Sequence, residues 1–334
     1  MTGCAIVTYR CNAKCQMCKI WEHPTRKSEE ITPDILDKIP DNFLDRINLT
    51  GGEPTIRDDI EELVRVLRKK AKLVELSTNG YFTERVVRVA DKYPDIMVRV
   101  SVEGLPALND KWRGTKDGFD HALRTMLELK KTRAKNIGFS VVIHDGNATD
   151  LLSLYELCTY LGVEFGNSTM HNSWFFCTTE NQIHNVPLAV ETEKQFIRAL
   201  LRSRRPGVKL RVKDWLRAYF NLNILQHLQG KSNLLRGCPA GRDLFFVDPY
   251  GNVLPCNGTV EPWIMGNLKT QNFDEIWNSP QAVEVRRRVG QCRLECAFIG
   301  TSRIDMRRRP WKVVSWIAKS KLKLAAGGDV VWPD

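Results

Sequence analysis

Three cysteines near the start of the chain have a spacing that suits metal-cluster chemistry. Cys11, Cys15 and Cys18 form a C-x3-C-x2-C run directly after the first strand that the sequence predicts, residues 4–9. A loop with this spacing can place three thiolates around one face of a [4Fe–4S] cube. Four cysteines are usual for such a cube, so one iron would keep an open position, as catalytic metal centres do. The alternative is a zinc site whose fourth ligand lies elsewhere, with His23 nearby.

A glycine-rich motif with one carboxylate follows the second expected strand. Residues 50–54 read Thr-Gly-Gly-Glu-Pro. Gly51 and Gly52 would let the backbone approach a ligand closely, and Glu53 supplies a carboxylate that can accept from an ammonium group. Taken alone, the same residues indicate only a turn.

Together, the two motifs resemble those of the radical S-adenosylmethionine (radical SAM) superfamily. The resemblance implies that the three cysteines hold a [4Fe–4S] cluster and that Gly51, Gly52 and Glu53 hold the amino group of S-adenosylmethionine. Ser101 and Arg113 resemble contacts to the ribose or carboxylate of this cofactor; the alternatives are a strand-end hydrogen bond and a surface arginine. The implied chemistry is one-electron cleavage of S-adenosylmethionine to a 5′-deoxyadenosyl radical, which takes a hydrogen atom from the substrate.

A second set of cysteines lies in the last third of the chain: Cys238, Cys256, Cys292 and Cys296. With its intervening motifs, the set resembles the SPASM/twitch extension of the same superfamily, which carries auxiliary clusters. The four thiolates are enough for one closed [4Fe–4S] cluster, the twitch arrangement, and a structural zinc site is the alternative. Cys4 and Cys158 fall in apolar patterns and are expected to be buried free thiols.

Short apolar strands alternate with amphipathic helices between these motifs. The expected strands cover residues 4–9, 46–49, 73–77, 97–102, 137–143 and 163–165, and the expected helices cover 33–39, 58–70, 83–92, 118–133 and 149–161. This alternation predicts βαβ units and a parallel sheet, open or part of a barrel, with working residues at the carboxyl ends of the strands. The family resemblance favours an α/β fold in which a partial (βα)6 TIM-like barrel is followed by a small α+β auxiliary iron–sulfur domain.

We expect four segments along the chain. They are a radical SAM partial barrel (1–190), a helical linker (191–236), a twitch/SPASM-like auxiliary cluster domain (237–300) and a basic amphipathic tail (301–334). The tail carries eight Lys or Arg residues and one acid between positions 303 and 324, which is +7 of the net charge of +11. Because the rest of the chain is nearly balanced, a nucleic-acid partner is not indicated.

The tail also has an amphipathic pattern. On a helical wheel its lysines face one way and most of its apolar residues the other, which resembles an interfacial helix in peripheral contact with an anionic membrane. The alternative is a helix packed on the barrel with a solvated basic face. The chain has ten cysteines, no signal-peptide pattern and no long uncharged apolar run, so we expect a cytoplasmic protein, with the membrane surface as a further location.

Four residues near strand ends are candidates for catalytic work: Glu103, His144, His171 and Cys177. The two histidines and the glutamate could act as bases, and Cys177 could face the active site, although each has an alternative as a structural group. The chain begins almost at the first strand, so we expect no preceding peptide-recognition domain. This expectation favours a small polar substrate such as a sugar, a cyclitol or a lipid-linked or phosphorylated molecule.

The expected reaction is oxidation or epimerisation, with the auxiliary cluster as electron acceptor or donor. A one-electron reductant such as flavodoxin or ferredoxin is the expected protein partner. The alternatives are a maturase that modifies a ribosomal peptide and, outside enzymes, an iron–sulfur electron carrier or redox sensor. The Gly51-Gly52-Glu53 motif argues against a simple carrier, which has no use for an open iron beside a cofactor pocket.

Overall fold

The computed structural model describes residues 1–231, 237–294 and 296–333. Within these ranges the strands form one sheet in the order β6-β5-β4-β3-β2-β1-β7-β8-β9. The strands are β1 (Thr2–Ile6), β2 (Arg46–Thr50), β3 (Val74–Thr78), β4 (Met97–Ser101), β5 (Asn136–Ile143), β6 (Glu164–Thr169), β7 (Leu244–Val247), β8 (Asn252–Leu254) and β9 (Gly266–Asn267). The six strands β1 to β6 are parallel, as the partial barrel requires.

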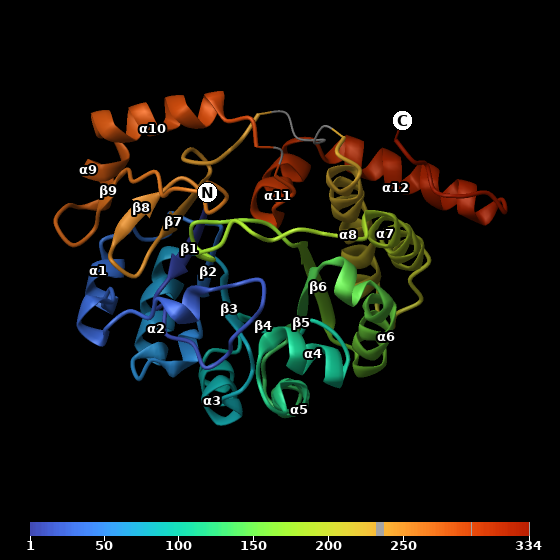
Figure 1. Ribbon diagram of the computed structural model, residues 1–334, viewed down its shortest axis with the longest axis horizontal. Helices are drawn as coiled ribbons and strands as arrows, with labels where there is room; N and C mark the ends of the chain where they lie inside the picture. The colour runs from blue at the N-terminus through green and yellow to red at the C-terminus, as the bar shows by residue number, and fades with distance from the viewer. Residues whose placement is uncertain (232–236, 295, 334) are drawn as a thin grey trace.

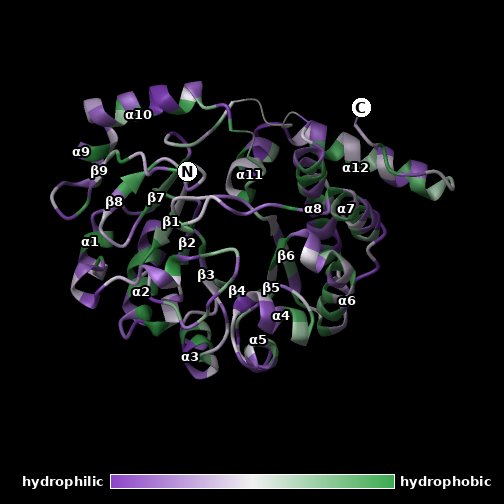
Figure 2. Cartoon of the chain, in the orientation of Figure 1, coloured by the Kyte–Doolittle hydropathy of each residue, from purple (hydrophilic) through white to green (hydrophobic). Residues whose placement is uncertain are grey.

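Helices cover the outer face of the curved sheet (Figure 1). In chain order, the helices on both sides of the sheet are α1 (Pro33–Asp37), α2 (Ile60–Lys70), α3 (Thr83–Lys92), α4 (Pro106–Arg113), α5 (Gly118–Leu129), α6 (Leu151–Leu161), α7 (Val186–Leu201), α8 (Val208–Leu228), α9 (Phe273–Trp277), α10 (Pro280–Gln291), α11 (Ile299–Arg308) and α12 (Pro310–Ala325). Single 3-10 turns occur at η1 (Ile20–Glu22), η2 (Lys27–Glu29), η3 (Pro54–Ile56) and η4 (Asp145–Asp150). Hydrophobic positions gather on the strands and on the helix sides that face them, whereas α10 is largely hydrophilic (Figure 2).

Strand β2 shows why the sheet has two unlike faces. Its residues alternate between half-buried polar and fully buried apolar, with Ile47 and Leu49 in the main core. Arg46 and Asn48 instead line a cavity inside the barrel. Because successive side chains of a strand point to opposite faces, this alternation gives an apolar outer face for the helices and a polar lumen.

The C-terminal strands continue the barrel sheet rather than forming a separate one. Strand β7 pairs in parallel with β1, with Thr2 opposite Leu244, and β8 and β9 follow as antiparallel strands. Helix α11 lies between the β7 side and the β6 side of the curved sheet (Figure 1). Its residues line the same cavity as Arg46 and Asn48, so the open side of the barrel is closed by the C-terminal region.

Most of the expected elements are confirmed, with shifts of one to two residues at many ends. The first strand begins and ends earlier than expected, because its pairing with β2 and β7 ends at Ile6 and leaves the following residues to the cysteine-bearing segment. Helix α4 was not predicted. The expected helical segment 191–236 corresponds to α7 and α8, which pack against each other, and α8 also packs against β6. Its last residues, 232–236, lie outside the described part of the chain.

The basic tail forms α11 and α12, and its arginines face the protein. Arg307 and Arg308 form ion pairs with Asp45 (3.1 Å) and Asp243 (2.5 Å), and Arg303 lines the barrel cavity. The apolar residues of α12 differ in exposure, since Val313 is buried whereas Val314 and Leu322 are exposed. In the described residues, no helix combines the length and apolar character needed to cross a membrane.

Candidate active site and auxiliary cluster site

The segment that carries Cys11, Cys15 and Cys18, here called the cysteine loop (residues 10–19), follows the carboxyl end of β1. Burial raises the pKa of the Cys11 thiol to about 12, and the neighbouring Glu53 carboxylate and Cys15 thiolate contribute to the same direction. Burial also raises the pKa of Cys15 and Cys18. The Glu103 carboxylate adds to this effect at Cys15, and the Cys15 and Cys11 thiolates add to it at Cys18. Buried thiols of this kind ionise only against a compensating positive charge, which an iron–sulfur cluster provides.

Helix α4 supports the cysteine loop from below. Backbone hydrogen bonds run from Lys14 N to the carbonyl of Arg113 (2.9 Å) and from Gln16 N to the carbonyl of Trp112 (2.8 Å). The next residue, Gly114, ends α4 in the left-handed conformation with φ of 56°, and a Cβ there would lie 2.6 Å from the carbonyl oxygen of Lys14. Only glycine allows both this turn and this close approach. Residues 112–114 therefore set the position of the cysteine loop relative to α4.

The two glycines of the 50–54 motif pack against the backbone between β1 and the cysteine loop. A Cβ on Gly51 would lie 2.5 Å from the carbonyl oxygen of Thr8, and one on Gly52 would lie 2.4 Å from that of Arg10. Gly52 N donates to the Thr8 carbonyl at 2.8 Å. Gly51 and Gly52 are therefore needed so that this segment can pack against the backbone that follows β1. The sequence motif alone did not reveal this reason for the two glycines.

The carboxylate of Glu53 is fully buried and already engaged. Its Oε1 accepts hydrogen bonds from Thr55 N (3.0 Å), Thr55 Oγ1 (2.5 Å) and Thr78 Oγ1 (2.8 Å), and its Oε2 accepts from Asn79 N (2.6 Å). Burial still raises its pKa, although these donors oppose the shift. These bonds make Glu53 a tie between the ends of β2 and β3. Its Oε2 accepts a single hydrogen bond, so the predicted contact with the amino group of S-adenosylmethionine stays a prediction, for this carboxylate as for the backbone of 51–53.

Arg113 and Glu103 form a buried ion pair with an Nη1–Oε1 distance of 3.0 Å. Glu103 Oε2 also accepts from Val142 N at 2.9 Å. Burial raises the pKa of Glu103 to about 7, against the opposing effect of Arg113. Burial alone would lower the pKa of Arg113, but the thiolates of Cys15 and Cys11 and the carboxylate of Glu103 together outweigh it. The alternative of a surface arginine is excluded, because Arg113 is only 9% exposed.

A cavity of about 760 Å³, the lumen cavity, occupies the inside of the barrel. The strands contribute polar side chains such as Ser77 and Ser140 to its wall, and α8, α11 and α12 close the opposite side. Ser140 is the register partner of Ser101, the expected cofactor contact at the end of β4. Ser77 directly precedes Thr78, which bonds Glu53. The lumen cavity therefore reaches the level of the strand ends where the cofactor motifs lie.

His144 is fully buried at the end of β5. Its ring centroid lies 3.7 Å from that of Trp112, and neither ring nitrogen has a hydrogen-bond partner among the described residues. Burial lowers the pKa of His144 to about 4, so the imidazole is neutral at pH 7. Since Trp112 supports the cysteine loop, this histidine packs against the scaffold of the site rather than projecting into the lumen cavity, whose lining residues do not include it.

His171 and Cys177 lie on the segment that follows β6. His171 Nδ1 contacts the carbonyl of Thr169 at 3.1 Å, and burial lowers the pKa of His171 to about 4. Its ring centroid lies 4.3 Å from that of Phe298. Cys177 has a positive φ of 52° in a turn whose neighbouring carbonyl, of Phe176, accepts from Lys19 N at 2.8 Å. The segment thus connects the cysteine loop to the C-terminal region.

The second cysteine set converges on one cavity of about 440 Å³. The four thiols that line it are Cys238, Cys256, Cys292 and Cys296. The other thiolates of the set raise the pKa of Cys296 further, after burial, to about 12. Phe298 lines the same cavity, which brings His171 to its edge. Cys4 and Cys158 are buried, as expected, and Cys4 lies in an apolar cluster against which Cys18 and Cys256 pack.

The donor sets fit iron–sulfur clusters. Each site gathers thiols, and thiolates are the ligands that such clusters take. The carboxylates nearest the first set, Glu53 and Glu103, are held by hydrogen bonds from Asn79 N and Val142 N. His23, the fourth ligand of the zinc alternative, is exposed. No three Cys, His, Asp or Glu side chains in the described ranges are arranged to hold a single metal ion. Thiolates that bind different irons of one cube need not converge on a single point.

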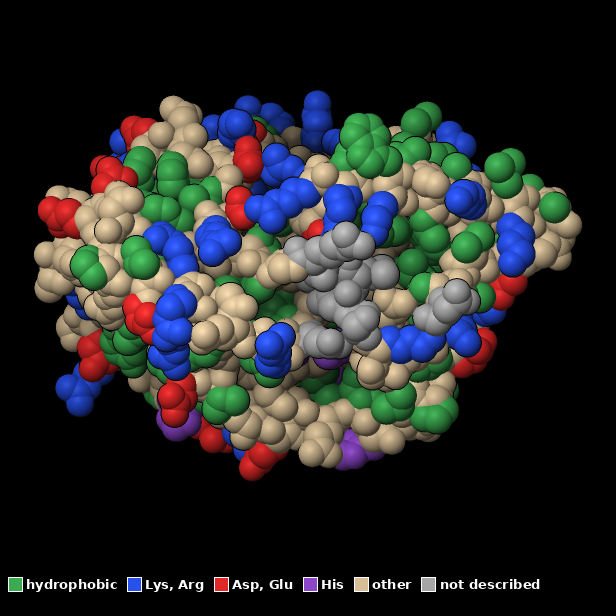
Figure 3. Space-filling view, turned by 90° about the horizontal axis from the view of Figure 1, so that it is seen from above, with side chains coloured by type: hydrophobic (Ala, Val, Ile, Leu, Met, Phe, Trp, Pro, Cys, Tyr) green, Lys and Arg blue, Asp and Glu red, His purple; other side chains and the backbone are tan. Residues whose placement is uncertain are grey.

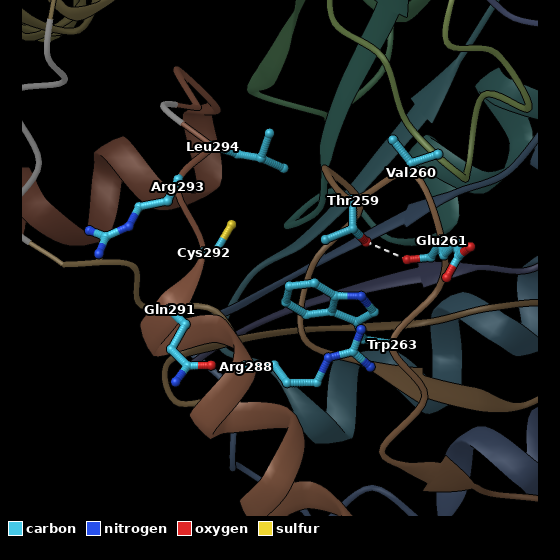
Figure 4. A pocket seen from close by; sticks show the side chains of 9 residues that line it. All are labelled: Thr259, Val260, Glu261, Trp263, Arg288, Gln291, Cys292, Arg293 and Leu294. Carbon is cyan, nitrogen blue, oxygen red and sulfur yellow. Dashed lines mark hydrogen bonds between the residues drawn. The ribbon is translucent and has the colours of Figure 1, made fainter.

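The outer side of Cys292 borders a surface pocket of about 490 Å³ (Figure 4). The guanidinium of Arg288 lies 4.5 Å from the ring centroid of Trp263, and Arg293 lies on the adjoining segment. Thr259 Oγ1 donates to the carbonyl of Glu261 at 2.6 Å on the facing loop. The second cysteine set is therefore only one residue layer from solvent on a side that carries two arginines.

Two groups of functional residues were missed by sequence reasoning. Trp112 lies on α4 and Gly114 ends it, and this helix of eight residues was not predicted. The lumen residues had a usable signal, since β2 and β3 place a polar residue at every second position. That alternation marks a polar inner face, but it does not say which distant residues close the lumen cavity.

The parallel partial barrel, the cysteine loop at its carboxyl end and the four-thiol cavity beside it define a class, the radical SAM enzymes with an auxiliary cluster domain. The model of the Radical SAM superfamily matches residues 5–158, and that of the SPASM iron–sulfur cluster-binding domain matches residues 238–297. The chain therefore belongs to the radical SAM superfamily, as a member that contains a SPASM domain. It uses a [4Fe–4S] cluster that binds S-adenosylmethionine, an auxiliary [4Fe–4S] cluster and S-adenosylmethionine itself.

Similar proteins include enzymes with different substrates. Pre-heme d1 synthase of Dinoroseobacter shibae is 25% identical over 91% of this chain and 83% of its own length. Mycofactocin maturase MftC of Mycobacterium tuberculosis is 30% identical over 82% of this chain and 69% of its own length. Among solved structures, native anSMEcpe with bound AdoMet has a TM-score of 0.64 at 16% identity, covering 95% of this chain and 100% of that chain. At that identity the structural likeness shows the fold alone.

Proposed function

We propose that this radical SAM enzyme oxidises or epimerises a small polar substrate held in the lumen cavity. The single observation that carries the proposal is the position of this cavity. It is closed by α8, α11 and α12 and reaches the level of the cofactor motifs at Ser140 and Ser77. Its volume of about 760 Å³ is typical of a small-molecule site, for which roughly 300–1,000 Å³ is usual. A sugar, a cyclitol or a phosphorylated molecule fits this description.

The protein's own residues position the reaction. Cys11, Cys15 and Cys18 would hold the cluster, and the backbone of 51–53 would contact S-adenosylmethionine. When bound, the cluster supplies the electron that releases a 5′-deoxyadenosyl radical. Arg113, buried beside the thiols, stabilises the negative charge of the site and orients the segment that carries it. Closure of the lumen cavity by α11 keeps water from the radical.

The auxiliary cluster is proposed to take or supply the second electron. Cys238, Cys256, Cys292 and Cys296 would hold it. His171 lies on the segment after β6, at the edge of this site, and is neutral at pH 7. Of the two histidines it is therefore the better placed to accept a proton, on its ring nitrogen Nε2. Glu103 is bound to Arg113 and Val142, which favours a positioning role over that of a base.

The test uses anoxically reconstituted protein with dithionite. We expect 5′-deoxyadenosine from S-adenosylmethionine, and its rate should rise when a substrate is present. Pools of deuterated sugars, cyclitols and their phosphates should transfer deuterium into 5′-deoxyadenosine. If the protein releases no 5′-deoxyadenosine beyond the level of a Cys11, Cys15 and Cys18 to alanine variant, the proposal is wrong.

A peptide maturase is the second candidate, supported by the relationship to mycofactocin maturase MftC. It predicts deuterium transfer from a labelled precursor peptide and none from the small-molecule pools. The same assay therefore separates the two candidates.

We also propose that an acidic electron carrier such as flavodoxin or ferredoxin docks beside Cys292. The pocket there carries Arg288 and Arg293, and opposite charges steer such encounters. Arg293→Glu should slow reduction by flavodoxin at low salt but leave reduction by dithionite unchanged. Equal slowing with both reductants would contradict this docking site.

The exposed side of α12 is proposed to touch an anionic membrane surface. Trp311, Val314 and Leu322 are 77%, 62% and 72% exposed, and Lys312 and Lys319 are exposed beside them. Lys and Arg side chains gather on the face that carries α10 and α12, with hydrophobic side chains between them (Figure 3). This mixture suits interfacial binding. Full-length protein should co-sediment with vesicles containing phosphatidylserine, and Trp311→Ser with Leu322→Ser should not. Equal recovery of both proteins would contradict the proposal.

A further inference from the structure

The lumen cavity is lined by far more positive than negative charge. Six cationic residues line it: Arg46, Arg99, Lys213, Arg217, Arg303 and Arg307. Two carboxylates, Glu75 and Glu164, line it as well. Buried cations are normally paired, so an excess of this size needs a physical explanation.

The carboxylates on the protein do not neutralise this set. Glu164 is shared by Arg99 (2.5 Å) and Lys213. Asp214, behind the wall, is likewise shared by Arg205 (3.3 Å) and Arg217 (3.7 Å). Two carboxylates are therefore shared among four cations, which leaves an excess of positive charge around the lumen cavity.

Arg303 lies half-buried on α11 and forms no salt bridge among the described residues, and the nearest acid that acts on it, Asp45, is already paired with Arg307. Its Nη1 is buried without a hydrogen-bond partner there. Burial and then the neighbouring Arg307 lower its pKa. Burial, Arg303 and Arg99 in turn lower the pKa of Arg46 to about 9, although Arg46 pairs with Glu75. The cations thus lie close enough to repel one another, and a bound anion would relieve this repulsion.

The charges occupy one end of the lumen cavity. Arg46 and Glu164 are the first residues of β2 and β6, whereas Ser77 and Ser140 lie farther toward the carboxyl ends. From Arg46 to Thr50 there are four residue steps of about 3.3 Å, so the charged floor lies roughly 13 Å from the cofactor motif. The wall formed by α11 and α12 adds apolar side chains such as Met306 and Val313.

We infer that the substrate is an anionic molecule whose acid groups are held by Arg303, Arg99, Arg46 and Lys213 at the floor of the lumen cavity, with its reacting end toward the cofactor motifs. This inference rests on the proposed function and names its substrate class. Carboxylate and phosphate groups share the required chemistry, since the planar guanidinium binds either in a bidentate manner. A body of about 10 Å between the acid groups and the reacting carbon would span the distance.

Arg303 is the residue on which to test the inference. Its removal leaves no carboxylate on the protein unpaired, so the fold should tolerate Arg303→Gln better than a change at Arg99 or Arg46. Arg124→Gln is the matched control, since this exposed arginine on α5 does not line the lumen cavity.

The experiment measures ligand binding by calorimetry on anoxic holoenzyme at fixed ionic strength. The probes are citrate as a tricarboxylate, pyrophosphate as a phosphate and glucose as a neutral compound. Citrate or pyrophosphate should bind and glucose should not. Arg303→Gln should weaken binding about tenfold or more, Arg303→Glu should abolish it, and Arg124→Gln should leave it unchanged. Whichever anion binds with the higher affinity indicates whether the acid group of the substrate is a carboxylate or a phosphate.

Two outcomes would overturn the inference. One is equal affinity in Arg303→Gln and the parent protein, and the other is no binding of either anion. In both cases release of 5′-deoxyadenosine from S-adenosylmethionine shows whether the proposed function survives, because that reaction does not need the arginine floor. Cluster absorbance and far-ultraviolet circular dichroism confirm that each variant is folded.

Discussion

The guanidinium of Arg113 lies 3.0 Å from the carboxylate of Glu103, and both side chains are buried directly beneath the cysteine loop. The pair joins α4 to the ends of β4 and β5, because Glu103 also accepts from Val142 N. A buried pair contributes less than its attraction suggests, but loss of one partner leaves the other charge unpaired.

This relationship predicts the stability of two variants. Arg113→Met should lower the free energy of unfolding by about 3–5 kcal/mol at pH 8, and Arg113→Met with Glu103→Gln should recover most of the loss. The pKa of Glu103 is raised to about 7 from 4.5, so this carboxyl favours the folded state below pH 4.5 and that contribution is lost as the pH rises through 7. The single variant should therefore lose less at pH 5 than at pH 8. Urea unfolding of anoxic protein at pH 5 and pH 8 measures the free energy of unfolding of each variant. A double variant that is no more stable than the single variant would contradict the pairing.

His144 predicts acid sensitivity. Its pKa is lowered to about 4 in the folded protein, whereas an unfolded histidine titrates near 6.5. The unfolded state therefore binds a proton first, and stability falls as the pH drops from 6.5 to 4. His144→Phe removes this contribution and keeps a ring against Trp112. Between pH 7 and pH 5 the variant should lose about 2 kcal/mol less than the parent. Urea midpoints at both values test this, and equal losses would show that His144 is not the group.

The two cysteine sets predict separable losses of iron. Replacing Cys11, Cys15 and Cys18 by alanine should remove about four irons per chain and abolish 5′-deoxyadenosine release. Replacing Cys238 and Cys256 by alanine should also remove about four irons, but cleavage of S-adenosylmethionine should remain. Iron analysis and product chromatography on reconstituted protein provide both readings. Loss of cleavage in the second variant with the first cluster intact would contradict independent sites.

The sequence was sufficient for the local features and insufficient for the long-range ones. The strands from β2 to β6 could be predicted because each is a short run bounded by turn residues, and the cysteine spacing pointed to a cluster. The parallel pairing of β7 with β1 could not, since Thr2 and Leu244 are far apart in the chain and nothing local records their register. Likewise, Arg303 looked like part of a basic surface until the fold placed it in the lumen cavity.

Glu53 shows a second limit of prediction from the sequence, which concerns the partners of a single side chain. A carboxylate after two glycines at a strand end indicates ligand binding, and the pattern says nothing of nearby donors. Thr55, Thr78 and Asn79 donate to it only after β2 and β3 are aligned. A motif thus predicts the place of a site better than the partner of each atom in it.

The contact between Gly114 and Lys14 gives the last prediction. At Gly114 an alanine would need a left-handed φ of 56° and would place its Cβ 2.6 Å from the carbonyl oxygen of Lys14, inside the cysteine loop. Gly162 has a similar φ of 69° but no atom within 4 Å of the added carbon, so it is the matched control. Both alanine variants should lose about 1 kcal/mol or somewhat more of stability from backbone strain. Only Gly114→Ala should also displace the loop, because the carbonyl that it meets belongs to the backbone and cannot move aside alone. We therefore expect Gly114→Ala to bind about half the iron of the parent, with the auxiliary cluster retained, and to release little 5′-deoxyadenosine. Gly162→Ala should keep the full iron content and activity. Equal iron content in the two variants would mean that α4 does not set the position of the cysteine loop.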